Sequence, residues 1–117
     1  RAIQARAVEL YDRNRPTEAI RRYKTALAID PGYLEAVNNL AVAMAQQGAL
    51  DESVRLFERA LQIFPDDAEV HYNLANSLLR LGRPQEAIRH YQETLRINPG
   101  HDAARRNLPV AHRRAQP

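Results

Sequence analysis

The chain has 117 residues, a formal net charge of +3 and no cysteine. This length suits one domain with a hydrophobic core, and the lack of cysteine excludes disulfide frameworks, cysteine zinc sites and cysteine nucleophiles. No apolar run approaches the roughly 20 residues of a membrane span, so we expect no membrane contact by this segment. An acidic middle between basic ends argues against a continuous basic surface for nucleic acid.

The first predicted helix covers residues 2–13. Asn14 then stands at the position that Gly48 and Gly82 occupy later in the chain. Glycine and asparagine most readily adopt the left-handed conformation that closes a helix, so all three positions predict the same helix end. Because the chain begins with Arg1 inside this helical pattern, we expect it to be a piece of a longer protein.

A second predicted helix follows each of these ends. Pro16 and Pro84 come two residues after their helix ends, and proline suits the first turn of a helix. Each second helix carries a stripe of small and large residues, which lets neighbouring helices interlock. The stripes are Ala19, Tyr23, Ala26 and Leu27; Ser53, Phe57, Ala60 and Leu61; and Ala87, Tyr91, Thr94 and Leu95.

The chain repeats itself with a period of 34 residues. Asn39-Leu40-Ala41 recurs as Asn73-Leu74-Ala75, and prolines at positions 31, 65 and 99 end the second helices in register. A helix–turn–helix unit of this period is typical of an α-solenoid.

These motifs resemble the tetratricopeptide repeat family, whose pattern has Leu-Gly in the first helix and Ala-x3-Phe in the second. Leucine with alanine fills the first motif here, and Ala19 with Tyr23, Ser53 with Phe57, and Ala87 with Tyr91 fill the second. The resemblance implies an all-α fold, a right-handed α-solenoid of three helix-turn-helix repeats plus a short C-terminal capping helix. The repeats would be residues 1–33, 34–67 and 68–101 of a single solenoid domain, with the cap and a basic tail in 102–117.

The C-terminal segment departs from the pattern. Pro109 falls where a small residue belongs, and proline inside a helix clashes with the preceding turn. We therefore expect a short helix near 102–108, followed by a basic tail that frays. A second departure is His71, which replaces a large apolar residue.

Catalytic patterns are absent from the sequence. The histidines 71, 90, 101 and 112 do not have metal-ligand spacing, and the four glycines are all explained by turns. We predict that the chain is not an enzyme and needs no metal or cofactor.

A column of asparagines marks the predicted site. The resemblance implies that the first helix of each unit lines a concave groove, where Asn39, Asn73 and Asn107 would stack as a ladder. A primary amide offers both donors and an acceptor to a peptide backbone. This ladder resembles that in the repeat arm of the O-linked N-acetylglucosamine transferases, which implies a groove for an extended peptide. A merely solvated column remains an equal alternative.

Five further residues of this inner face complete the predicted site: Asn38, Tyr72, Asn76, Arg80 and Gln46. Tyr72 and Arg80 are the candidate anchors, because tyrosine and arginine concentrate binding energy at interfaces; Tyr72 could equally pack against the next helix. Some relatives grip a terminal carboxylate with basic side chains, but those positions hold Gln4, Glu69 and Asn73 here, which argues against such a clamp.

The predicted function is protein–protein interaction, with a protein or peptide partner. An alternative is a spacer or a homo-oligomer that docks through exposed terminal helices. Nucleic-acid binding rests only on the arginines and is the weakest possibility. Arg21, Arg55 and Arg89 each follow a glutamate by three residues, which predicts exposed ion pairs on an outer face.

Overall fold

The structure, a computed structural model, describes residues 16–117. This part of the chain is entirely helical outside its turns, as the sequence predicts. The helices are α2 (Pro16–Ile29), α3 (Leu34–Gln46), α4 (Leu50–Ile63), α5 (Ala68–Arg80), α6 (Pro84–Ile97) and α7 (Asp102–Ala115). The predicted first helix and Asn14 lie outside the described residues. Within residues 16–117, no helix is long and apolar enough to span a membrane.

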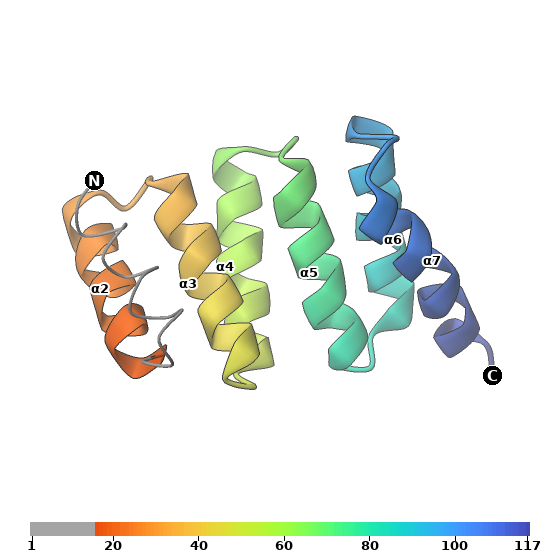
Figure 1. The fold of residues 1–117 in the computed structure, drawn as a ribbon, viewed down its shortest axis with the longest axis horizontal. Coiled ribbons are helices and arrows are strands. Elements are labelled where there is room, and N and C mark those ends of the chain that lie inside the picture. Colours follow the sequence, from red (N-terminus) through yellow and green to blue (C-terminus); the bar gives the residue numbers. More distant parts are fainter. Residues whose placement is uncertain (1–15) are drawn as a thin grey trace.

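The helices form a solenoid with two layers. In Figure 1, α3, α5 and α7 lie side by side in front, and α4 and α6 lie behind them. Each helix packs against the next along the chain, and α3 also contacts α5. The molecule measures 43 × 25 × 22 Å, so it is elongated along the direction in which the repeats stack. The helical-repeat prediction is confirmed.

Two glycines end the front helices α3 and α5. Gly48 and Gly82 have φ values of +83° and +77°, the left-handed conformation that the sequence predicts. The amide of the residue after each glycine bonds back across the turn, from Ala49 to Met44 and from Arg83 to Leu78, at 2.9 Å in both cases. A Cβ on either glycine would meet no atom within 4 Å, so the backbone angle and not lack of space requires glycine.

The core follows the predicted stripes of the second helices. The Ala19, Ser53 and Ala87 positions are each 0% exposed, and the large residues Phe57 and Tyr91 fill the space between layers. On the front helices, the repeated Asn-Leu-Ala places Leu40, Ala41, Leu74 and Ala75 in the same core. Small residues at 41 and 75 allow the helices to approach closely.

The capping helix is longer than the sequence predicts. We expected it to stop near residue 108, but α7 continues to Ala115 with Pro109 inside it. Ala104, Leu108 and Ala111 recur at helical spacing and pack on the core, whereas Pro109 is exposed. Burial of this stripe outweighs the hydrogen bond that Pro109 cannot donate. Most of the predicted fraying tail is therefore helix.

The outer-face ion pairs also differ from the prediction. Glu18 pairs with Arg22 at 3.6 Å, not with Arg21, and Glu86 pairs with Arg83 at 2.6 Å, not with Arg89. Both pairs are partly exposed to solvent, so each contributes little to stability.

Candidate functional site

The predicted site residues lie on α3, α5 and α7. We call the surface of these three helices that carries Asn39, Asn73 and Asn107 the ladder face. All eight predicted residues retain some solvent exposure. Arg80 and Gln46 are exposed, and the other six are partly buried. By helix, they are Asn38, Asn39 and Gln46 on α3; Tyr72, Asn73, Asn76 and Arg80 on α5; and Asn107 on α7.

Hydrogen bonds between neighbouring front helices organise this face. Asn73 Nδ2 donates to Asn38 Oδ1 at 3.3 Å, and Asn107 Nδ2 lies 3.4 Å from the Tyr72 hydroxyl, to which it donates. Arg80 Nη1 donates to the Ala45 carbonyl at 3.0 Å. Each bond joins residues 35 positions apart. Asn73 and Asn107 thus bond diagonally to the preceding repeat, whereas no such bond of Asn39 occurs within residues 16–117.

A pocket of about 210 Å³ opens on the ladder face between α3 and α5. Four of the predicted site residues line it together with the nearly buried Phe57 of α4. The four are Gln46, Asn73, Asn76 and Arg80; Val42, Ala45 and Ser77 complete the lining. Polar groups therefore surround a small, partly apolar depression.

A second polar network joins α5, α6 and α7. The carbonyl oxygen of Asn76 accepts from the Tyr91 hydroxyl and from Asn107 Nδ2, the latter at 3.3 Å. Burial raises the pKa of Tyr91 to about 12, so its hydroxyl stays protonated and can donate. Tyr72 packs by this network, with its ring centroid 4.6 Å from that of His101 and 6.1 Å from that of Tyr91. Tyr72 therefore packs against its neighbours in the fold, which is the alternative role considered for it above.

These bonds determine what the amides still offer to a ligand. Asn107 uses both N–H groups of its amide within the chain, which leaves its carbonyl oxygen as an acceptor. Asn73 uses one N–H group and keeps a second N–H and its carbonyl. The carbonyl of Asn76 is occupied twice, which leaves its NH2 group as the donor.

Arg114 belongs to the ladder face, although the sequence pattern predicted that it would lie in a frayed tail. It lies seven residues after Asn107, as Arg80 follows Asn73 and Gln46 follows Asn39, so the three have a common helical phase. Its positive charge also acts on Tyr91 and opposes the rise in pKa of that hydroxyl. The period of 34 between Arg80 and Arg114 could have revealed this residue, but the early helix end expected at Pro109 concealed it.

A pair of histidines links α5 to α6 behind this face. His71 is 7% exposed, and its Nδ1 lies 3.0 Å from His90 Nδ1, while its Nε2 lies 2.7 Å from the Pro65 carbonyl. Because a carbonyl only accepts, His71 Nε2 carries a proton, and His90 Nδ1 donates to His71 Nδ1 in the neutral pair. If both rings are protonated, two N–H groups face each other. Burial, reinforced by the charge of His71, lowers the pKa of His90 below its usual 6.5.

We expect the free energy of unfolding to fall as the pH drops from 7 to 5. The unfolded chain binds the proton that folded His90 resists, so the native state loses stability below the ordinary histidine pKa. The lowered pKa values of Glu86 and Glu93 contribute a loss near and below their usual 4.5, outside this window. Urea unfolding at both pH values measures the effect. A His90→Gln chain should show a smaller pH dependence, whereas His112→Gln, at an exposed position, should keep it.

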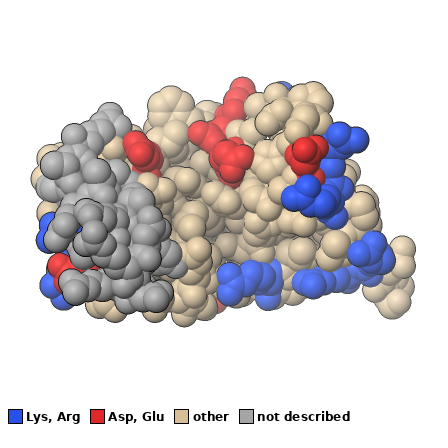
Figure 2. Space-filling view, viewed as in Figure 1, with Lys and Arg blue, Asp and Glu red and all other residues tan. Residues whose placement is uncertain are grey.

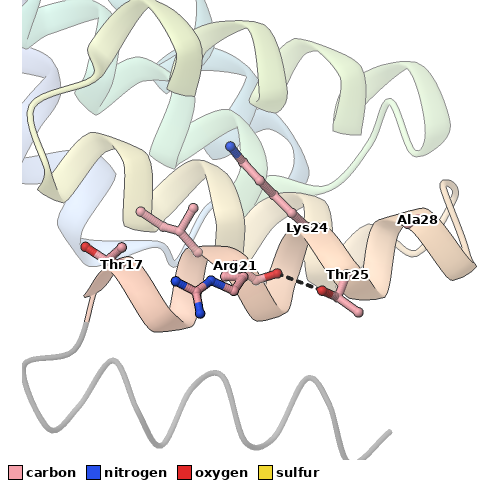
Figure 3. Close-up of a pocket in the computed structure, with 6 residues that line it drawn as sticks. Thr17, Arg21, Lys24, Thr25 and Ala28 are labelled. Carbon is pink, nitrogen blue, oxygen red and sulfur yellow. Dashed lines mark hydrogen bonds between the residues drawn. The ribbon is translucent and has the colours of Figure 1, made fainter.

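Other features of the described residues add no second site. No group of three or more metal-binding side chains occurs within residues 16–117. A hollow of about 490 Å³ runs along α2 and is lined by Thr17, Ile20, Arg21, Lys24, Thr25 and Ala28. Figure 3 shows that the labelled residues all come from this one helix, where the Thr25 hydroxyl bonds to the Arg21 carbonyl. None of the predicted site residues belongs to this hollow.

Solved structures share this fold. No curated protein sequence matches the chain. A mutant O-GlcNAc transferase of Thermobaculum terrenum superposes with a TM-score of 0.88 and 27% identity, over 94% of this chain and 21% of that enzyme. The chain thus spans about a fifth of the length of that transferase.

Two structures of lower sequence identity show the fold alone. The first TPR of Spaghetti (RPAP3), bound to an HSP90 peptide, has a TM-score of 0.93 and 16% identity, over 96% of this chain and 89% of that one. MamA has a TM-score of 0.88 and 20% identity, over 96% of this chain and 61% of that one.

The family assignment rests on the sequence as well as the fold. The sequence model of the tetratricopeptide repeat family matches residues 10–76 and again residues 45–108. Together these overlapping matches cover residues 10–108, which is most of the chain. The resemblance to the repeat arm of an O-GlcNAc transferase is confirmed by the structural match. The chain belongs to the tetratricopeptide repeat family.

Proposed function

We propose that the ladder face binds an extended segment of a partner protein, with Asn39, Asn73 and Asn107 bonding to the backbone of that segment. Tetratricopeptide repeats are protein-interaction modules and are typically non-catalytic. The RPAP3 repeat binds a peptide of HSP90, and the O-GlcNAc transferase carries a repeat region of this fold, which supports a peptide as the ligand class.

Two of the three ladder amides are held in one orientation before a ligand binds. Asn73 is held by its bond to Asn38, and Asn107 by its bonds to Tyr72 and Asn76. A ligand therefore meets fixed acceptors and donors and does not have to order them, which favours affinity. A freely solvated column would lack these bonds.

The spacing of the front helices suits an extended peptide. Packed helices lie about 8–10 Å apart, and an extended chain advances about 3.3–3.6 Å per residue. One ladder amide would therefore meet about every third residue of the ligand. Backbone pairing of this kind accepts many sequences, so specificity would come from the pocket beside Asn73, where Arg80 and Gln46 lie.

Self-association through α7 receives less support. The outer surface of α7 exposes Arg105, Arg106, His112 and Arg113 around Pro109. Two copies of this cationic surface would repel each other across a two-fold interface. We therefore expect α7 to act as a polar cap, as terminal repeats do.

We expect Asn73→Ala to weaken peptide binding about tenfold. The substitution removes up to two hydrogen bonds to the ligand, each contributing about 0.5–1.5 kcal/mol. Peptides would first be selected by the natural chain from a display library of random twelve-residue segments, and their affinities measured by calorimetry for both chains. Gln92→Ala removes an exposed amide from α6, on the far layer, and should leave affinity unchanged.

Folding of each variant would be checked by circular dichroism, because Asn73→Ala also removes the bond to Asn38. If a folded Asn73→Ala chain bound the selected peptides as tightly as the natural chain, the ladder would have no part in binding. If the natural chain selected no peptide at all, the proposed function itself would fail.

A further inference from the structure

Two arginines form a second column on the ladder face. Arg80 and Arg114 are both exposed, lie one repeat apart, and each follows a ladder asparagine by seven residues. Seven residues are nearly two full helical turns, so each arginine lies on the same side of its helix as the asparagine before it. The corresponding position on α3 is Gln46, which is polar but uncharged. The positive charge therefore lies over α5 and α7 only.

The charges of these arginines are not neutralised within the described residues. The ion pairs in this part of the chain involve Arg22, Arg83, Arg96, His101 and Arg105, and none involves Arg80 or Arg114. Arg80 gives one N–H to the Ala45 carbonyl, which anchors the guanidinium at the pocket and leaves its other donors available. An anchored guanidinium binds a carboxylate at a smaller entropic cost than a mobile one.

The acidic groups of the same face lie at its opposite edge. Figure 2 shows Lys and Arg atoms along the lower edge, where α5 and α7 end, and Asp and Glu atoms toward the upper edge, where the front helices begin; further Lys and Arg atoms lie at the upper right, beside acidic ones. Glu69 at that upper edge bonds to His101 at 2.6 Å. The ladder asparagines lie between the two edges, so a peptide along the ladder would have one side facing the arginine column.

We propose that the ligand of the ladder face is an extended peptide with acidic side chains two residues apart, whose carboxylates pair with Arg80 and Arg114. This inference rests on the proposed function. In an extended chain, alternate side chains point to the same side and lie about 7 Å apart. Arg80 is held at the pocket, and the long side chain of Arg114 on the neighbouring front helix reaches a second carboxylate at that spacing. The ligand groups are side-chain carboxylates and not a chain terminus, because a peptide along the ladder continues past Arg80 toward Asn39 on α3.

The experiment is a comparison of selected peptides. Random twelve-residue segments are displayed between fixed linkers, so that no free terminal carboxylate is present. Selection by the natural chain should enrich Asp or Glu at two positions separated by one residue. An Arg80→Gln/Arg114→Gln chain should still select peptides but without this enrichment, and an Arg80→Glu/Arg114→Glu chain should enrich Lys or Arg at the same two positions.

Affinity for one selected acidic peptide gives a second readout. The Gln double variant should bind it about tenfold more weakly, and the loss should shrink as salt is added, because screening weakens the ion pairs of the natural chain. Arg113→Gln is the matched control: it removes the same charge from the neighbouring residue, which lies about 100° round the helix. This variant should bind as the natural chain does.

The outcomes separate this inference from the proposed function. Selected peptides without acidic enrichment, or an enrichment that persists in the Gln double variant, would overturn the arginine proposal while peptide binding stands. Equal losses in Arg113→Gln and Arg114→Gln chains would also overturn it, since net charge alone would then explain the effect. Failure of the natural chain to select any peptide would remove both.

Discussion

Leu74→Ala should cost about 3 kcal/mol of unfolding free energy, the larger of the two main stability effects that we expect. Leu74 is 0% exposed and lies at the centre of α5, where it packs between both layers of the solenoid. Large-to-small changes at such positions leave a cavity and typically cost about 2–5 kcal/mol. Urea unfolding followed by circular dichroism at neutral pH measures the change.

Leu61→Ala provides the comparison, because Leu61 is only partly buried on α4. The same atoms are removed there, but part of the side chain already contacts water, so the cost should be clearly smaller. Equal losses at the two positions would contradict the core described here.

Pro109→Ala should stabilise the chain by up to about 3 kcal/mol. Pro109 lies inside α7 and faces solvent, where proline is about 3 kcal/mol less favourable than alanine because it lacks an N–H and crowds the preceding turn. Alanine would restore the bond to the Arg105 carbonyl without altering the buried stripe at Ala104 and Ala111. A higher urea midpoint is the expected result.

Arg106→Ala serves as the control for this gain. Arg106 is exposed on the same helix, and arginine and alanine differ little in helix propensity, so the midpoint should hardly move. A Pro109→Ala chain of unchanged or lower stability would mean that the proline ring makes a contact worth as much as the missing bond.

The periodic features of the fold were readable from the sequence because each has a local cause. The left-handed backbone at Gly48 and Gly82 requires residues without a Cβ penalty, and the prolines that follow can begin or end helices but rarely sit within them. Repetition of these signals every 34 residues fixed the helix pairs and the faces they bury.

The end of α7 was mispredicted because local and tertiary terms compete there. The penalty at Pro109 is visible in the sequence, but the burial of Ala111 against the core depends on how α7 packs on α6. The truncated helix then hid Arg114 from the predicted site. Tertiary packing that overrides local propensity is the usual source of such errors.

The predicted ladder residues do lie on one face, but their bonding could not be predicted. Links such as Asn73 to Asn38 join residues 35 apart, one more than the repeat. Adjacent helices meet through sides of different helical phase, and one residue changes that phase by about 100°. The pairing of His71 with His90 joins two different helices and likewise has no signal in residue spacing. Contacts of this kind depend on the relative placement of helices, which composition does not encode.

The most direct test of the central claim, backbone recognition by the ladder, is a methylation scan of one selected peptide. Each peptide N–H is replaced in turn by N–CH3, and affinity is measured for the natural and Asn73→Ala chains. We predict one position where methylation costs the natural chain about tenfold and costs the variant little, the coupling expected when Asn73 accepts that N–H. Equal losses in both chains at every position would contradict backbone recognition by Asn73.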